Sequence, residues 1–230
     1  MVKIIKENRE FYNSPIQREL LIELVKEPMI AKNFFLTGGT ALSVFYLYHR
    51  QSDDLDLFTI QRVNLSEISL WLKRKWKERV IAIKESGHFL SLLIDSVKVE
   101  FVIDPLSFDE ERPFYTFEKG LTFSIDTINN IASNKFNACV SRVEAKDYVD
   151  FYFILKKYPD MNLDDLYSMT SKKDAIFDDY PTVAFQIEEG VGFIKRNKAI
   201  MPKIKVDFDF NDFLKFYERL TIWVYERGRT

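Results

Sequence analysis

The N-terminal part of the chain changes its hydrophobic period several times. Ser14-Pro15 is a typical helix start, because serine can cap free amides and proline suits the first turn, and apolar residues then recur at helical spacing until Pro28. Residues 33–37 are mostly apolar and run into two glycines, which predicts a short buried strand followed by a tight turn. A second helical pattern follows over residues 41–48.

Strand-like alternation begins at residue 54. Leu55 and Leu57 fall on one face of a predicted strand over 54–60, and Asp54 and Asp56 fall on the other. Asn64 with Glu67 three residues on resembles a capping box and predicts a helix. Further alternation predicts a hairpin of residues 80–85 and 88–95 and a strand over 97–104.

From about residue 108 the pattern becomes mostly helical. We expect helices over 126–142 and 146–157, helical segments opening at Asn162, Tyr180 and Asn211, and one strand over 202–210. The sequence thus predicts an α+β protein. Residues 1–107 would form an α/β core with a mixed or antiparallel sheet, and residues 108–230 a mostly helical C-terminal domain.

Composition narrows the class of protein. The 230 residues are 47% apolar and include 21 Phe, which excludes disorder and supports a well-filled core. No apolar run approaches the ~20 residues that cross a bilayer, and the polar start does not resemble a signal peptide. We therefore expect a cytoplasmic protein with no membrane contact. The single cysteine, Cys139, fits a reducing compartment and is expected in the core.

Charge gives no general preference for nucleic acid, because the net charge is only −2. A local basic cluster is nevertheless present, and such runs usually form a solvated face. We call it the basic cluster; it consists of Lys73, Arg74, Lys75, Lys77 and Arg79.

Asp54 and Asp56 are the first candidates for chemistry. Side chains two apart in a strand point the same way, and two close carboxylates repel each other unless a cation lies between them or one is protonated. Oxygen ligands favour Mg²⁺ or Mn²⁺. If strand 97–104 is a neighbour, Glu100 would complete a three-carboxylate site for two metal ions about 3.5–4 Å apart. Asp104 is the alternative third ligand, although Pro105 suggests that the strand has ended.

The turn Gly38-Gly39-Thr40 is the second candidate. Glycines let backbone amides approach a phosphate closely, the following helix begins with free N–H groups, and Thr40 adds a hydroxyl. An ordinary tight turn and an exposed pair of acids remain open as alternatives.

The order strand, Gly-Gly-Thr, helix, Asp-x-Asp resembles the nucleotidyltransferase superfamily that includes polymerase beta. The stretch FFLTGGTALSVFYLYHRQSDDLDLF resembles the abortive-infection AbiEii-type toxins even more, and residues 37–58 match that pattern at nearly every position. The stretch KFNACVSRVEAKDYVDFYFIL is similar to the second half of the family pattern. Its matching residues are Lys135, Arg142, Lys146, Asp147 and Asp150.

This resemblance implies a division of roles. Lys135 would hold the nucleotide triphosphate, and Asp147 would orient it or the base and sugar. The expected catalytic residues are Asp54, Asp56, Glu100, Lys135 and Asp147, the first three also being metal ligands. The expected nucleotide-binding residues are Gly38, Gly39, Thr40, Arg50, Ser52, Lys135 and Arg142.

The resemblance also implies a function, which is Mg²⁺-dependent transfer of an NMP from an NTP to an RNA such as tRNA or to a protein. The protein would be the toxin of a bacterial toxin-antitoxin pair, with a cognate antitoxin as partner. Two alternatives stay open: an inactive nucleotide-binding or partner-binding module, and an aminoglycoside-type nucleotidyltransferase with a small-molecule acceptor.

Overall fold

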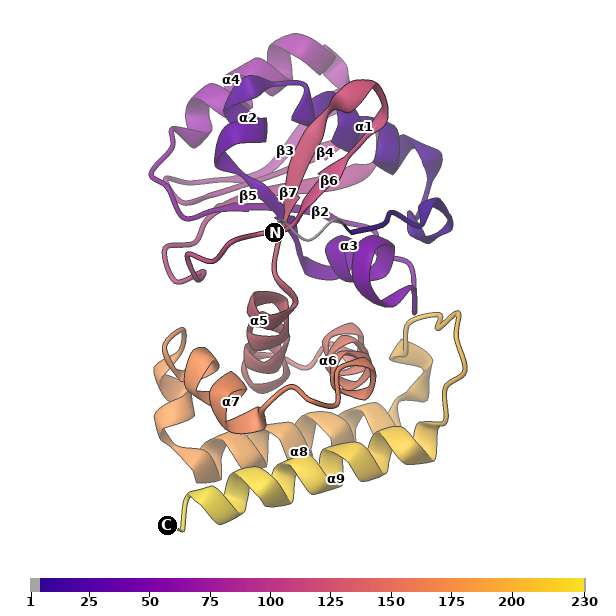
Figure 1. Ribbon diagram of the computed structural model, residues 1–230, viewed down its shortest axis with the longest axis vertical. Coiled ribbons are helices and arrows are strands. Elements are labelled where there is room, and N and C mark those ends of the chain that lie inside the picture. Colours follow the sequence, from indigo (N-terminus) through magenta and orange to yellow (C-terminus); the bar gives the residue numbers. More distant parts are fainter. Residues whose placement is uncertain (1–4, 230) are drawn as a thin grey trace. The chain divides into compact units, whose positions relative to one another are not determined.

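The computed structural model describes residues 5–229 and divides into two compact units, one up to Ile128 and one from Asn129 (Figure 1). The strands of the described chain are β1 Phe35–Thr37, β2 Leu55–Thr59, β3 Val80–Glu85, β4 Phe89–Ile94, β5 Val97–Ile103, β6 Phe114–Thr116 and β7 Thr122–Ile125. The α-helices are α1 Pro15–Val25, α2 Pro28–Asn33, α3 Gly38–Ala41, α4 Leu65–Trp76, α5 Ile128–Ser141, α6 Ala145–Lys157, α7 Leu163–Ser171, α8 Tyr180–Arg196 and α9 Phe210–Arg227. The short 3-10 helices are η1 Arg9–Phe11, η3 Lys77–Arg79, η4 Glu118–Gly120, η5 Ala175–Asp178 and η6 Lys198–Ile200. The element η2, Leu42–Leu47, is a π-helix.

The first unit is built on one mixed sheet with the strand order β3-β4-β5-β2-β1-β7-β6. The pairs β5/β2 and β1/β7 are parallel, and the remaining neighbours are antiparallel. This confirms the expected α+β class. It also confirms that strand 97–104 lies beside strand 54–60, the adjacency that the proposed third carboxylate requires.

The two faces of the central strands differ in character, as their alternation predicts. Leu55 and Leu57 of β2 are fully buried together with Val99 and Phe101 of β5, and Phe34 packs edge-on against Phe101. Figure 1 shows α1, α2 and α4 over one side of the sheet. The opposite face of β2 and β5 carries the polar residues, so the apolar burial of one face fixes which side chains the other face presents.

The segment that follows the glycine turn is a helix of unusual form. The helical period over residues 41–48 is observed, but α3 passes directly into the π-helix η2, and all residues of η2 are buried. The segment ends at Tyr48, whose φ of 57° is left-handed. A wider helical turn and a left-handed exit together set the path of the chain toward Arg50 and Ser52.

The second unit is helical around an aromatic core. Helices α8 and α9 run side by side (Figure 1). Tyr217 donates a hydrogen bond to the carbonyl oxygen of Tyr148 at 2.6 Å, and Tyr148 donates one to that of Cys139 at 2.5 Å. Cys139 is buried, as expected, and burial raises the pKa of its thiol well above the ordinary value.

Three sequence-based expectations need correction. The boundary expected at residue 107 falls later, because β6 and β7 join the sheet of the first unit through the β1/β7 pair. Residues 202–210 do not form the expected strand; Phe208, one of the alternating apolar residues, packs against the rings of Tyr152, Phe153 and Phe213. The helix expected from Asp126 begins at Ile128.

Among residues 5–229, every helix is too short or too polar to cross a bilayer.

Candidate active site

A row of polar side chains crosses the sheet of the first unit. In the strand register Asp56 lies opposite Glu100 on β5 and opposite Thr37 on β1, and Glu100 lies opposite Ser91 on β4. Register partners point to the same side of a sheet. Thr37 extends the row by donating a hydrogen bond to Asp126, just beyond β7, at 2.7 Å. Four strands and the residue after β7 therefore gather polar side chains on one face.

Gly38 lies directly against one of the acids. A Cβ built on Gly38 would be 2.0 Å from Oδ2 of Asp56, far inside any allowed contact, and its φ of 69° is one that L side chains rarely adopt. Only glycine fits at this position. The backbone of the glycine turn therefore lies directly against a carboxylate of the Asp-x-Asp strand.

Gly39 contacts the residues that follow η2. A Cβ at Gly39 would be 2.4 Å from the Ser52 hydroxyl oxygen and 3.0 Å from Nη2 of Arg50. Arg50 is buried, and its Nη1 donates to the carbonyl oxygen of Gln51 at 2.8 Å. The structure thus brings Gly39, Arg50 and Ser52 together, three of the residues expected to bind the nucleotide.

Thr40 and Gln17 hold the backbone of the acidic segment. The Thr40 hydroxyl is buried and donates to the carbonyl oxygen of Asp54 at 2.5 Å, so in this structure it supports the acids rather than facing a ligand. Gln17 of α1, also buried, donates to the carbonyl oxygen of Ser52 at 2.9 Å. Gln17 escaped the sequence analysis. The signal was available, because this amide occupies the same helical face as Leu20 and Leu24.

Lys98 is the second residue that the sequence analysis missed. It lies two positions before Glu100 on the same face of β5, and its Nζ is 2.6 Å from Oε1 of Glu100 and 4.0 Å from Oδ2 of Asp54. Ser91 donates a second hydrogen bond to the same Glu100 oxygen at 3.1 Å. Partial burial lowers the pKa of Lys98, but the hydrogen bond to Glu100 and the charges of Asp54, Glu100 and Asp56 outweigh it and raise the pKa overall.

These contacts test how well the acids fit a divalent metal. Within residues 5–229, no group of three or more carboxylate, imidazole or thiol side chains is arranged to hold a metal ion. Asp54 and Asp56 offer the oxygen ligands that Mg²⁺ prefers, and the ammonium of Lys98 already shows that a cation is favoured beside them. Glu100 is paired with Lys98. The chemistry of the acid pair therefore suits a hard cation, whereas a three-acid metal site is not assembled within residues 5–229.

Asp104 is engaged elsewhere. It lies beyond the end of β5, and its carboxylate accepts hydrogen bonds from the Leu106 amide at 3.1 Å and the Ser107 hydroxyl at 2.6 Å. These bonds shape the turn that follows the strand, which leaves Glu100 as the candidate third acid.

The second family motif forms a buried ion network within the second unit. Nζ of Lys135 is 2.7 Å from Oδ1 of Asp147 and 2.8 Å from Oδ2 of Asp150, and both carboxylates are fully buried. Arg142 donates from Nε to Oδ2 of Asp147 at 2.8 Å. Lys146, in contrast, is partly exposed and pairs with Glu144. The structure brings Lys135, Asp147 and Asp150 together and completes the group with Arg142.

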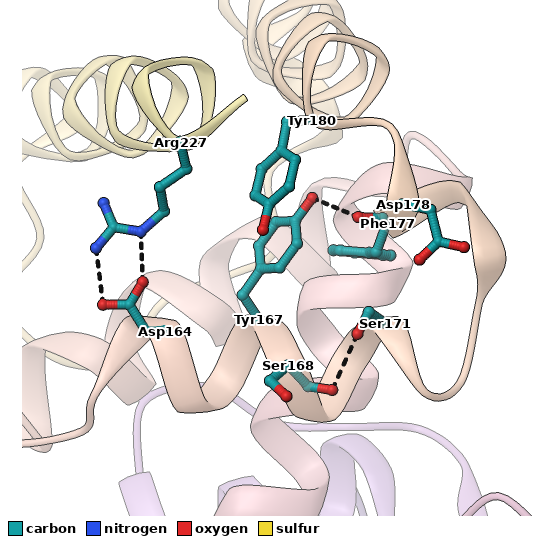
Figure 2. Close-up of a pocket in the computed structure, with 8 residues that line it drawn as sticks. All are labelled: Asp164, Tyr167, Ser168, Ser171, Phe177, Asp178, Tyr180 and Arg227. Atoms are coloured by element: carbon teal, nitrogen blue, oxygen red, sulfur yellow. Dashed lines mark hydrogen bonds and ion pairs between the residues drawn. The ribbon is translucent and has the colours of Figure 1, made fainter. Parts of the chain in front are cut away.

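The second unit also has a pocket of about 310 Å³, and none of the candidate site residues lines it (Figure 2). Its walls are tied to one another: Tyr167 stacks on Tyr180 with ring centroids 4.7 Å apart, Tyr167 donates to the carbonyl oxygen of Phe177 at 2.8 Å, and Arg227 forms two hydrogen bonds with Asp164. Because the polar groups named here already form hydrogen bonds within the protein, we assign the pocket no catalytic role.

Comparison with known proteins agrees with this picture. The family model described as nucleotidyl transferase AbiEii toxin, Type IV TA system, matches residues 26–174. No curated protein matches the chain. Among solved structures, a candidate nucleotidyltransferase from H. pylori is 17% identical with a TM-score of 0.56, covering 96% of this chain and 97% of its own. JHP933 from Helicobacter pylori is also 17% identical, with a TM-score of 0.51 and coverage of 97% and 95%. MenT4, a nucleotidyltransferase toxin from Mycobacterium tuberculosis, is 16% identical with a TM-score of 0.46 and coverage of 80% and 65%.

The similarity to the H. pylori structures shows a shared fold over nearly the whole chain. The family match spans more than half of the sequence and includes both motifs, the glycine turn with its acid pair and the stretch from Lys135 to Asp150. The chain therefore belongs to the AbiEii family of nucleotidyltransferase toxins.

Proposed function

We propose that this protein transfers an NMP from an NTP to an acceptor in a Mg²⁺-dependent reaction, as the cytoplasmic toxin of a toxin-antitoxin pair. One observation carries the proposal: the backbone of Gly38 lies against the carboxylate of Asp56, so the turn suited to phosphate and the acid suited to a cation share one small volume. Membership of the AbiEii family supports the toxin role and, with it, a cognate antitoxin as partner.

Each residue has a definite task in this proposal. Asp54 and Asp56 would hold the divalent cation, which would supply positive charge for the α-phosphate and the departing pyrophosphate. The backbone of Gly38 and Gly39 admits the phosphates closely, because neither residue carries a side chain that would hold them away. Thr40 keeps the Asp54 backbone in place. Positioning and charge stabilisation thereby supply most of the rate.

The family resemblance assigns tasks to the second motif as well. Lys135 would hold the triphosphate, and Asp147 would orient it. In this structure the Lys135 ammonium is paired with the buried carboxylates of Asp147 and Asp150, and Arg142 also binds Asp147. These tasks would therefore require Lys135 to exchange a carboxylate for the triphosphate.

Asp56→Asn tests the reaction directly. The protein is incubated with Mg²⁺, each NTP labelled at the α-phosphate, and total RNA or protein from a bacterial host, and label transfer is followed. We expect the variant to lose about 10²–10³-fold or more in rate, since amide oxygen and nitrogen replace a charged ligand. Asp109→Asn, a change of the same type at an exposed position, should keep the wild-type rate. Transfer by Asp56→Asn at the wild-type rate would remove the proposed mechanism.

We propose RNA as the acceptor because the basic cluster offers an exposed positive surface. All five residues of the basic cluster are exposed on α4 and η3, although Lys73, Lys75 and Arg79 also pair with nearby acids. If this cluster binds RNA, affinity for bulk tRNA falls steeply as salt rises, and Arg74→Glu weakens binding at low salt. Binding that is absent or insensitive to salt would instead point to a protein or small-molecule acceptor.

A further inference from the structure

Lys98 has a position that the proposed reaction does not require. Its ammonium lies on the polar face of β5, 2.6 Å from Glu100 and 4.0 Å from Asp54. The register pairs Leu55 with Val99 and Asp56 with Glu100. Lys98 therefore lies level with the start of β2, on the same face of the sheet as Glu100. A positive charge of the protein therefore occupies the space between two of the three acids expected to bind metal.

Glu100 is held in this arrangement by two donors. Its Oε1 accepts from both Lys98 and Ser91, whereas Asp54 is contacted by Lys98 only at the 4.0 Å limit of an ion pair. A metal ion at this same oxygen would have to displace the ammonium. That ammonium would then remain beside Asp54 and repel the incoming cation.

From this geometry we infer that Lys98 is the resident counter-ion of the acidic site and limits it to one divalent cation, which is held by Asp54 and Asp56. Glu100 then acts through Lys98 as a positioning residue rather than as a metal ligand. The inference rests on the proposed function, because it presupposes a reaction that uses a divalent cation. It differs from the arrangement expected from the sequence, in which three acids hold two ions.

The net charge of the acidic site provides a test, because it affects how many Mn²⁺ ions bind and how tightly. The wild-type site carries three carboxylates and one ammonium, and Lys98→Met removes the only positive member of that set. Mn²⁺ alone is the probe, and bound ions are counted from the loss of the free Mn²⁺ signal in electron paramagnetic resonance. We expect one bound Mn²⁺ for the wild type. For Lys98→Met we expect a second bound ion and roughly tenfold tighter binding of the first. Lys98→Arg keeps the charge and should keep the wild-type count.

A charge cycle with Glu100 separates this effect from a general loss of structure. Glu100→Gln removes one negative charge, so Mn²⁺ should bind roughly tenfold more weakly than to the wild type. In the double variant the two changes cancel in net charge, and one Mn²⁺ should bind with nearly wild-type affinity. Lys84→Met removes a lysine whose ammonium lies over the ring of Phe89, and should leave Mn²⁺ binding unchanged. Circular dichroism of each variant verifies folding.

Two outcomes overturn the inference. One is a wild type that binds two Mn²⁺ ions or none; the other is a Lys98→Met variant with the wild-type count and affinity. Label transfer by the same wild-type preparation keeps the two proposals apart. Active transfer with either outcome refutes the role of Lys98 alone, whereas the expected Mn²⁺ pattern without any transfer refutes the proposed function and leaves the one-cation site standing.

Discussion

Replacing Gly38 by alanine tests whether the turn and the acid pair form one site. The new Cβ would lie 2.0 Å from Oδ2 of Asp56, and ordinary contact begins at 3.4 Å, so the carboxylate must move by about 1.4 Å, the difference between these distances. A misplacement of this size in a catalytic group reduces rate by about 10²-fold. The left-handed φ of 69° adds about 1–2 kcal/mol of strain for a residue with a Cβ.

Gly120→Ala is the matched control, because it separates strain from displacement. Gly120 has a similar φ of 73°, but a Cβ there meets nothing within 4 Å. Both variants should lose about 1–2 kcal/mol in urea unfolding from the left-handed φ, and Gly38→Ala should lose more because of its clash. Only Gly38→Ala should lose nucleotide transfer. Transfer by Gly38→Ala at the wild-type rate would refute the reasoning. An equal loss of transfer in both variants would attribute it to stability instead.

Two further predictions concern charged groups. Lys135→Met leaves the buried carboxylates of Asp147 and Asp150 without their shared ammonium, so we expect about 3–5 kcal/mol lower stability in urea unfolding; a loss below about 1 kcal/mol would show that the network contributes little. Burial alone would raise the pKa of Glu7, but hydrogen bonds from Arg18 and two tyrosines lower it overall from 4.5. Glu7 therefore stabilises the fold above pH 4.5, and this contribution is lost as pH falls through the lower, folded-state pKa. Urea unfolding across that range should show a weaker pH dependence for Glu7→Gln than for the wild type, and an unchanged dependence would contradict the assignment.

Local patterns in the sequence predicted the parts of the fold that local forces decide. The two-residue period placed Asp54 and Asp56 on one face of a strand, and the Ser86-Gly87 turn marked the β3/β4 hairpin. The short strands β6 and β7 were missed, because three or four residues are too few for a period to show. Their place in the sheet depends on pairing with β1, which is distant in the sequence.

The candidate site, like the fold, was predicted from the sequence only in part. The identity of the acids and glycines was visible in the sequence, and the neighbouring position of Glu100 followed from treating two segments as adjacent strands. The pairing of Lys98 with Glu100 was not visible, because alternation assigns a face but does not say which charges on that face meet. The role of Asp104 in a turn was signalled in part by Pro105.

The buried amide of Gln17 shows that the residues supporting the acids extend beyond the part of the chain that matches the family model. The family match starts at residue 26, yet the side chain that grips the carbonyl of Ser52, just ahead of the acids, comes from the helix before that point. A truncated protein that begins at the start of the match would keep every residue of the motifs but would lose the Gln17 hydrogen bond that holds the backbone just before β2.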